Sequence, residues 1–179
     1  MAGSLELIST TTMTDDVQTV NITNVFSDKY DVYMIKGSNM LGKNSTATGA
    51  NLRFINASDS VISSSDYHYA QLTMKGNASF GEDRSTTETR LFNVFSSLDD
   101  NGQSQGNVAY VFNPFSTSSF TFCQWQSASM PSGNLRGHKG IGLLDSTVSI
   151  TGFQVELNES ASRFSGQGKV SVYGVNNGR

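Results

Sequence analysis

The sequence predicts an all-β protein: an antiparallel β-sandwich of jelly-roll type with about ten short strands and little or no helix. Ser, Thr, Asn and Gly make up about two fifths of the 179 residues, and these residue types favour turns and strands over helix interiors. Short alternating segments recur along the chain, each followed by a turn-forming cluster. No window has apolar residues at helical spacing over three turns. The 11 Phe and 6 Tyr supply the core that a disordered chain lacks.

Each predicted strand has one apolar face to bury. The alternation is clearest where Val108, Tyr110 and Phe112 share one face, because side chains two residues apart in a strand point to the same side. The turn clusters between the strands are rich in Gly, Asn, Asp and Ser. In chain order the predicted strands cover residues 5–10, 17–23, 30–36, 52–56, 67–74, 89–95, 108–112, 120–126, 141–144, 148–157 and 169–175.

The chain is predicted to form a single β-sandwich domain over residues 1–179, with residues 1–14 as an anchoring N-terminal arm. No Pro-rich or charged linker divides the sequence, and no repeat of fixed period is visible. A chain of this length buries enough surface to fold without a disulfide or a metal ion. No cofactor is predicted.

Charge and composition argue against several classes of partner. The net charge is −3 and the basic residues are not clustered along the sequence, so we expect no nucleic-acid partner. No apolar run approaches the length needed to span a bilayer, so we expect no membrane insertion. The single cysteine, Cys123, cannot form an intrachain disulfide, which is compatible with folding in a reducing cytoplasm.

Three residues are the natural candidates for catalysis, and for each a structural role is the better interpretation. His68 lies in a predicted strand, where a surface or sheet-packing role is expected. His138 lies in a glycine-flanked basic segment, which we interpret as a solvated loop, with anion binding as the alternative. Cys123 alternates with core residues and behaves as a small apolar side chain. There is no G-x-S-x-G motif. The sequence therefore predicts no catalytic residues and no enzymatic activity.

Oxygen-rich clusters are too poorly spaced to predict a metal site. Residues 99–102 read Asp-Asp-Asn-Gly but lack the alternation and the closing Glu of a calcium loop, so a hairpin turn is expected there. Asp15 and Asp16 form an isolated pair. Glu82, Asp83 and Glu88 are candidates for paired glycosidase carboxylates, with ion pairs to Arg84 and Arg90 as the alternative. The glycines at 137, 140 and 142 match no nucleotide-binding motif.

Aromatic residues and long loops are the candidates for binding sugars. Tyr67, Tyr69 and Trp125 are the possible stacking residues, although most aromatics must fill the core. The loops at 37–51 and 128–140 are the longest expected, and loops commonly carry recognition. The sequence alone does not rank these candidates as binding residues.

Several segments resemble a group of small β-rich virion proteins of tailed bacteriophages, particularly phages of marine bacteria. The segments are MAGSLELI, FSDKYDVYMI, NLRFINASDSVI, SFGEDR, AYVFNPFSTSSFTF, KGIGLL, STVSITGFQV and GKVSVYGV, and together they cover nearly the whole chain. The resemblance implies a structural protein on the surface of the phage particle, synthesised in the cytoplasm of the host bacterium. It brings no catalytic residues with it.

The expected function is that of a capsid decoration or cement protein, which sits on the outside of the head and stabilises the shell. Its expected partner is the major capsid protein or another virion protein, and binding only the assembled shell would stabilise that state. A homotrimer is expected, with an interface supplied by residues 112–122 or by the termini. The main alternative is a tail-fibre or other appendage component that binds a host-surface glycan. An isolated carbohydrate-binding module and a glycan depolymerase remain further alternatives.

Overall fold

The computed structural model describes residues 4–43, 48–77, 80–98 and 106–176. Within them the regular structure is β-strand, apart from one short 3-10 turn at Pro131–Gly133. The all-β prediction is therefore confirmed. The strands are β1 (Leu5–Thr12), β2 (Thr19–Ile22), β3 (Val32–Ser38), β4 (Thr48–Asn56), β5 (Tyr67–Lys75), β6 (Gly81–Glu88), β7 (Leu91–Leu98), β8 (Gly106–Phe112), β9 (Thr121–Ser129), β10 (Arg136–Leu144), β11 (Ile150–Leu157) and β12 (Lys169–Val175).

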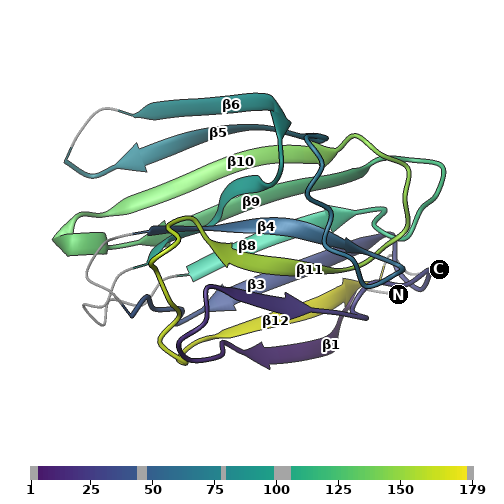
Figure 1. Ribbon diagram of the computed structural model, residues 1–179, viewed down its shortest axis with the longest axis horizontal. Helices are drawn as coiled ribbons and strands as arrows, with labels where there is room; N and C mark the ends of the chain where they lie inside the picture. Colours follow the sequence, from purple (N-terminus) through teal and green to yellow (C-terminus); the bar gives the residue numbers. More distant parts are fainter. Residues whose placement is uncertain (1–3, 44–47, 78–79, 99–105, 177–179) are drawn as a thin grey trace.

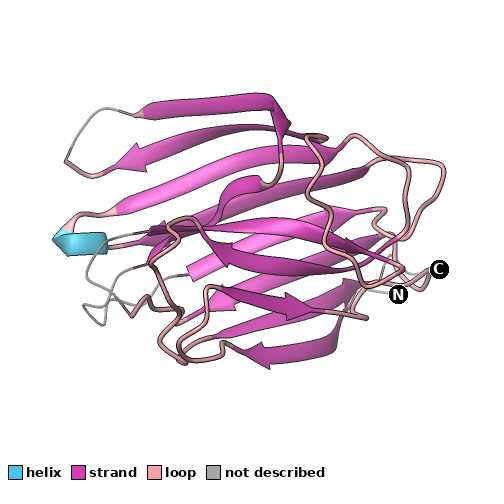
Figure 2. Cartoon of the chain, viewed as in Figure 1, coloured by secondary structure: helices cyan, strands magenta, loops and turns pink. Residues whose placement is uncertain are grey.

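The strands form two antiparallel sheets. The larger sheet has eight strands in the order β1-β12-β3-β8-β9-β10-β5-β6, and the smaller has four in the order β2-β11-β4-β7. Figure 1 shows β4 and β11 lying across the strands of the larger sheet, while β5 and β6 form one of its edges. The same view coloured by secondary structure shows strands and loops throughout, with the 3-10 turn at one end (Figure 2). The two layers make a jelly-roll sandwich, as predicted.

The core lies between the two sheets. In β8 the face expected to be buried, that of Val108, Tyr110 and Phe112, is directed to solvent, and Ala109 and Val111 are buried instead. In β9 the core follows the predicted alternation. In β9 the inward-pointing Cys123 and Trp125 are buried, whereas the outward-pointing Phe122 is 45% exposed. Phe26 packs edge-on against Tyr33 with ring centroids 4.8 Å apart. Such aromatic pairs add to the stabilisation that comes from burial of apolar area. The larger sheet thus has one face committed to the core and a second face directed to solvent.

Strands β6 and β10 differ most from the sequence prediction, and both differences have a physical cause. Strand β6 was not predicted, because its sequence GEDRSTTE has no apolar face: it is an edge strand exposed on both sides. Strand β10 begins at Arg136, five residues before the predicted start, in a stretch where glycines had indicated a loop. Residues Leu5–Thr12, within the segment expected to be an anchoring arm, form the edge strand β1 and pair with β12.

Two further predictions concern a hairpin turn and membrane insertion. The hairpin turn predicted at residues 99–102 lies outside the described residues. Across the residues with a described conformation, no helix has the length and apolar character required to cross a membrane.

Candidate ligand-binding face

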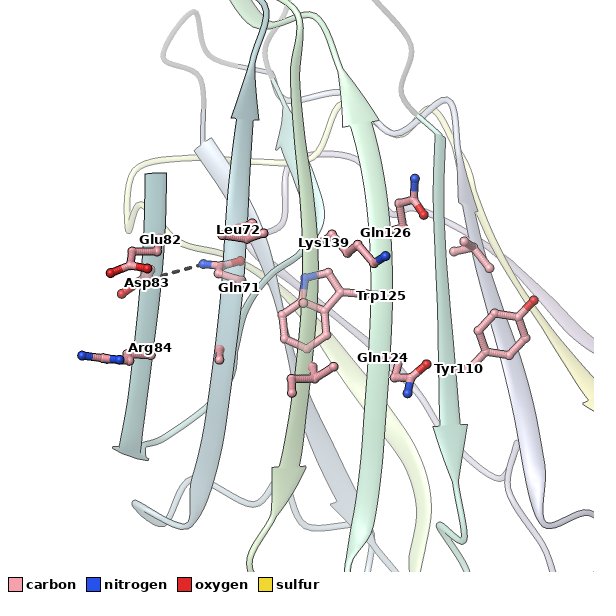
Figure 3. A pocket seen from close by; sticks show the side chains of 14 residues that line it. Gln71, Leu72, Glu82, Asp83, Arg84, Tyr110, Gln124, Trp125, Gln126 and Lys139 are labelled. Carbon is pink, nitrogen blue, oxygen red and sulfur yellow. Dashed lines mark hydrogen bonds between the residues drawn. The ribbon is translucent and has the colours of Figure 1, made fainter. Parts of the chain in front are cut away.

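A hollow of about 560 Å³ lies over β6, β5, β10, β9 and β8 of the larger sheet. Figure 3 shows its lining side chains. Ten of the fourteen lining residues occupy alternate strand positions whose side chains point away from the core. They are Ala70, Leu72, Glu82, Arg84, Val108, Tyr110, Gln124, Gln126, Lys139 and Ile141. We call this solvent-directed side of the eight-stranded sheet the outward face.

The register of the sheet arranges the outward face in transverse rows, because directly opposed residues of antiparallel strands project to the same side. The Ile141 row runs through Arg84, Ala70, Ile141, Gln124, Tyr110, Met34 and Tyr173. The adjacent Lys139 row runs through Glu82, Leu72, Lys139, Gln126, Val108, Lys36 and Ser171. The hollow occupies the part of both rows that lies between β6 and β8.

The hollow combines exposed apolar groups with hydrogen-bonding side chains. Ile141 is 58% exposed, Leu72 52% and Tyr110 38%, which is unusual for large apolar residues in the middle of a sheet. Gln124 and Gln126 lie on β9 between them, and each amide offers both donors and an acceptor. An extended surface of this kind can bind a ligand that has both apolar and hydroxyl-bearing sides.

A second hollow of about 310 Å³ continues the first along the outward face. The two share Ala70, Gln124 and Ile141, so they adjoin. The second adds His68 and Phe122, which lie on β5 and β9. The candidate site is therefore an elongated depression.

The edge of the site is held by a hydrogen-bonded group on the inner side of the sheet. The Tyr69 hydroxyl donates to Asp83 Oδ2 at 2.8 Å, and Gln71 Nε2 donates to the same oxygen at 3.3 Å. Burial, together with the hydrogen bond to Asp83, raises the pKa of Tyr69 above its usual range. The hydroxyl therefore stays protonated and keeps donating, which fastens β6 to β5 beside the hollow.

The carboxylate pair considered for glycoside cleavage is not formed. Glu82 and Asp83 are consecutive in β6 and point to opposite faces of the sheet, and Glu88 lies at the far end of that strand. The alternative pairing is also wrong for Arg90, whose Nη1 lies 2.8 Å from Oε2 of Glu156. Consecutive strand positions never converge, a constraint that the sequence could have supplied had β6 been recognised.

The two histidines occupy different faces of the larger sheet. The expectation of a solvated loop at His138 is wrong: it lies in β10 opposite Ser127 and is 3% exposed. Burial, with smaller effects from Arg136 and Lys75, lowers its pKa to about 4. The nearby glycines make close packing possible rather than a loop. His68 lies on the outward face, with Nε2 3.6 Å from Oδ2 of Asp145.

Cys123 and the candidate stacking residues lie inside the protein. Cys123 is buried, and burial raises the pKa of its thiol to about 12. Tyr67, Tyr69 and Trp125 are 0%, 7% and 3% exposed, so they do not form a sugar-stacking platform. The exposed aromatic residues are instead Tyr110 and Phe122, whose exposure the sequence pattern did not predict. Their opposition to Gln124 and Phe112 in the register places them on the outward face.

Among the residues that the structure describes, no group of three or more His, Cys, Asp or Glu side chains is arranged to hold a metal ion. Asp15 and Asp16 instead form ion pairs with Lys43, whose Nζ lies 3.3 Å from Oδ2 of Asp15 and 3.5 Å from Oδ1 of Asp16.

Comparison with known proteins yields only distant structural similarity. No protein-family model matches the chain, and no curated protein matches it. A solved endo-β-1,4-glucuronan lyase from the fungus Trichoderma reesei is 8% identical, with a TM-score of 0.28, over 97% of this chain and 86% of the lyase. A solved family 7 alginate lyase is 12% identical, with a TM-score of 0.26, over 89% of this chain and 66% of the lyase.

These neighbours require one correction. The prediction from the sequence that the protein is not an enzyme is overturned, since both of these neighbours are lyases. At these TM-scores the likeness carries no argument for a particular activity of this chain.

Proposed function

We propose that this is a bacteriophage virion protein that binds a polysaccharide through the outward face of its eight-stranded sheet. The observation that carries the proposal is the elongated hollow, in which exposed apolar side chains alternate with amides. It corresponds to the appendage alternative of the sequence analysis. The binding surface differs from the loops considered there, because it lies on the strands.

The chemistry of the face suits a sugar chain. A sugar ring presents C–H groups on its faces and hydroxyls at its edges. Tyr110, Ile141 and Leu72 offer apolar surface for the faces, while Gln124 and Gln126 offer donors and acceptors for the hydroxyls. Binding sites of this kind combine apolar contact with a few directional polar groups.

The size of the hollow suits several sugar units. It crosses five adjacent strands, which are about 4.8 Å apart, so it extends roughly 20 Å across the sheet. Rigid strands, rather than loops, hold the contacting side chains in place. Preorganisation of this kind lowers the entropy cost of binding.

Binding of host-surface polysaccharides to the 179-residue chain tests the proposal. We expect the wild-type protein to bind at least one bacterial surface polysaccharide on a glycan array, and Ile141→Asp and Gln124→Ala to weaken that binding. Phe80→Ala is the matched control, since Phe80 is 74% exposed and does not line the hollow. If Phe80→Ala and Ile141→Asp weaken binding equally, or if no polysaccharide binds, the proposal fails.

Capsid decoration is the second candidate, and the β1 edge of the outward face, at the opposite side of the sheet from β6, favours it. Leu5 and Leu7 on the edge strand β1 are 53% and 56% exposed, and an edge strand has backbone groups free to pair with another chain. The major capsid protein is the proposed partner, and assembly as a homotrimer is part of this proposal.

Copy number distinguishes the two placements. Quantitative mass spectrometry of purified virions should give a number close to that of tail components for an appendage, or a number comparable with the shell subunit for decoration. Absence from purified virions would overturn both placements, while leaving polysaccharide binding to be judged by the array.

A further inference from the structure

The outward face has a charge opposite in sign to that of the whole chain. The strand registers place Lys36, Lys139, Lys169 and Arg84 on this face, with Glu82 as the single acidic residue among its described strand positions. The complete chain contains 15 acidic and 12 basic residues. Among its described strand positions, the face that carries the hollow therefore has an excess of basic over acidic residues.

These four basic side chains are exposed, and no ion pair involves any of them within the described part of the chain. Two lysines outside this face are paired: Lys29 Nζ lies 2.7 Å from Oε1 of Glu6, and Lys43 Nζ lies 3.3 Å from Oδ2 of Asp15. An unpaired cation beside a hollow of low polarity attracts anionic ligands without first having to break an internal ion pair.

The spacing of the cations indicates a ligand whose negative charges are widely separated along its length. Lys139 and Lys36 occupy the same row three strands apart, which corresponds to about 14 Å, and Arg84 is two strands from Lys139, about 10 Å. The neutral residues Gln126 and Val108 lie between Lys139 and Lys36 in this row. Duplex DNA carries one charge per roughly 1.7 Å of its axis, which is far denser than this array. An acidic polysaccharide, whose charges are separated by neutral ring atoms, matches the pattern better.

We infer that the ligand of the outward face is an anionic polysaccharide bearing carboxylate groups, as in a polymer of uronic acids. Lys139 and Arg84 bind carboxylates within the hollow, and Lys36 and Lys169 extend the contact beyond it. The amides of Gln124 and Gln126 bind the sugar hydroxyls between charged positions. This inference rests on the proposed function and specifies the class of polysaccharide.

The test compares two forms of one polymer by isothermal titration calorimetry with the full chain. The probes are polygalacturonate and carboxyl-reduced polygalacturonate, which share a backbone and differ in charge. We expect tighter binding of the charged form. We also expect its affinity to fall as the salt concentration rises from 50 to 200 mM, because added salt screens exposed ionic contacts and the Debye length is about 10 Å near 100 mM.

Substitutions locate the effect. Lys139→Gln and Lys36→Gln should each weaken polygalacturonate binding about two- to five-fold, as expected for exposed ionic contacts. Lys43→Gln is the matched control, because Lys43 is an exposed lysine that is not on the outward face; it should leave binding unchanged. Thermal unfolding of each variant verifies folding.

The outcomes separate the two proposals. Equal binding of both polymers, or a loss with Lys43→Gln as large as with Lys139→Gln, overturns the anionic specificity while polysaccharide binding stands. Tighter binding of a single-stranded oligonucleotide than of polygalacturonate also overturns the inference. If neither polymer binds and the glycan array shows no ligand, the proposed function itself fails.

Discussion

The indole of Trp125 on β9 lies against Gly140 on β10, so close that a methyl group at residue 140 would come within 2.2 Å of Cζ2. The absence of a side chain at this glycine is therefore what allows the largest aromatic ring of the sheet to be buried. The contact lies directly beneath the outward face, since Ile141 and Gln124, the next residues along each strand, line the hollow.

Gly140→Ala should destabilise the protein by about 1–3 kcal/mol, because overpacking forces Trp125 or the strand to move. Gly81→Ala is the matched control: a methyl group there would meet only Thr73 Cβ, at an ordinary 3.9 Å. Urea unfolding at neutral pH gives both values. Equal effects of the two substitutions would show that the Trp125 contact does not limit packing.

Tyr67→Phe removes a buried hydroxyl that links strand β4 to the loop between β4 and β5. The hydroxyl accepts from Phe54 N at 2.8 Å and donates to Ile62 O at 3.0 Å, and Tyr67 is fully buried. Leaving those backbone groups unpaired should cost about 1–3 kcal/mol of unfolding free energy. Tyr110→Phe, at a 38% exposed position, is the control and should change stability by less than about 0.5 kcal/mol.

Stability should fall as the pH drops from about 6.5 towards 4, because of His138. Its pKa is lowered to about 4 by burial and by nearby Arg136 and Lys75, so in this range the unfolded chain binds a proton that the folded protein does not. Between neutral pH and pH 4.5, His138 should lower the free energy of unfolding by about 2–3 kcal/mol.

His138→Gln should flatten this pH dependence, whereas His68→Gln, at the solvent-facing histidine, should keep it. Chemical unfolding at pH 7 and pH 4.5 measures the difference. An identical loss of stability in wild type and His138→Gln would assign the acid sensitivity to other groups.

Cys123 should resist alkylation in the folded protein. Its side chain is 1% exposed, and burial raises the thiol pKa to about 12, so the reactive thiolate is scarce and inaccessible. Mass spectrometry after incubation with iodoacetamide at pH 8 should show no adduct in buffer and one adduct in denaturant. Rapid labelling of the folded chain would mean that the β9 core opens readily.

The sequence predicted the strands that have one apolar face and missed the strand that has none. Strand β9 alternates strictly, so its buried and exposed positions follow from the period of two. Strand β6 is polar on both sides, because it is a sheet edge, and nothing in its local pattern distinguishes it from a loop. The glycines of β10 indicated a loop because their function is not visible locally. They leave room for Trp125 and Leu91, which belong to other strands.

The candidate site depends almost entirely on tertiary structure. Arg84, Ile141 and Tyr110 lie far apart in the sequence, and only the strand order β8-β9-β10-β5-β6 brings them into one row. The sequence suggested Tyr67, Tyr69 and Trp125 as stacking residues because it identifies aromatics without identifying which side of a sheet they face.

By itself the sequence determined that this chain forms an all-β sandwich and that Cys123 lies in its core, because alternation and turn composition are local properties. The tertiary structure alone decided which face of the larger sheet meets solvent, that His138 is buried, and that four cations without an ion pair among the described residues share a surface with the hollow. Those features arise from pairing between distant strands, whose order and register no local pattern encodes.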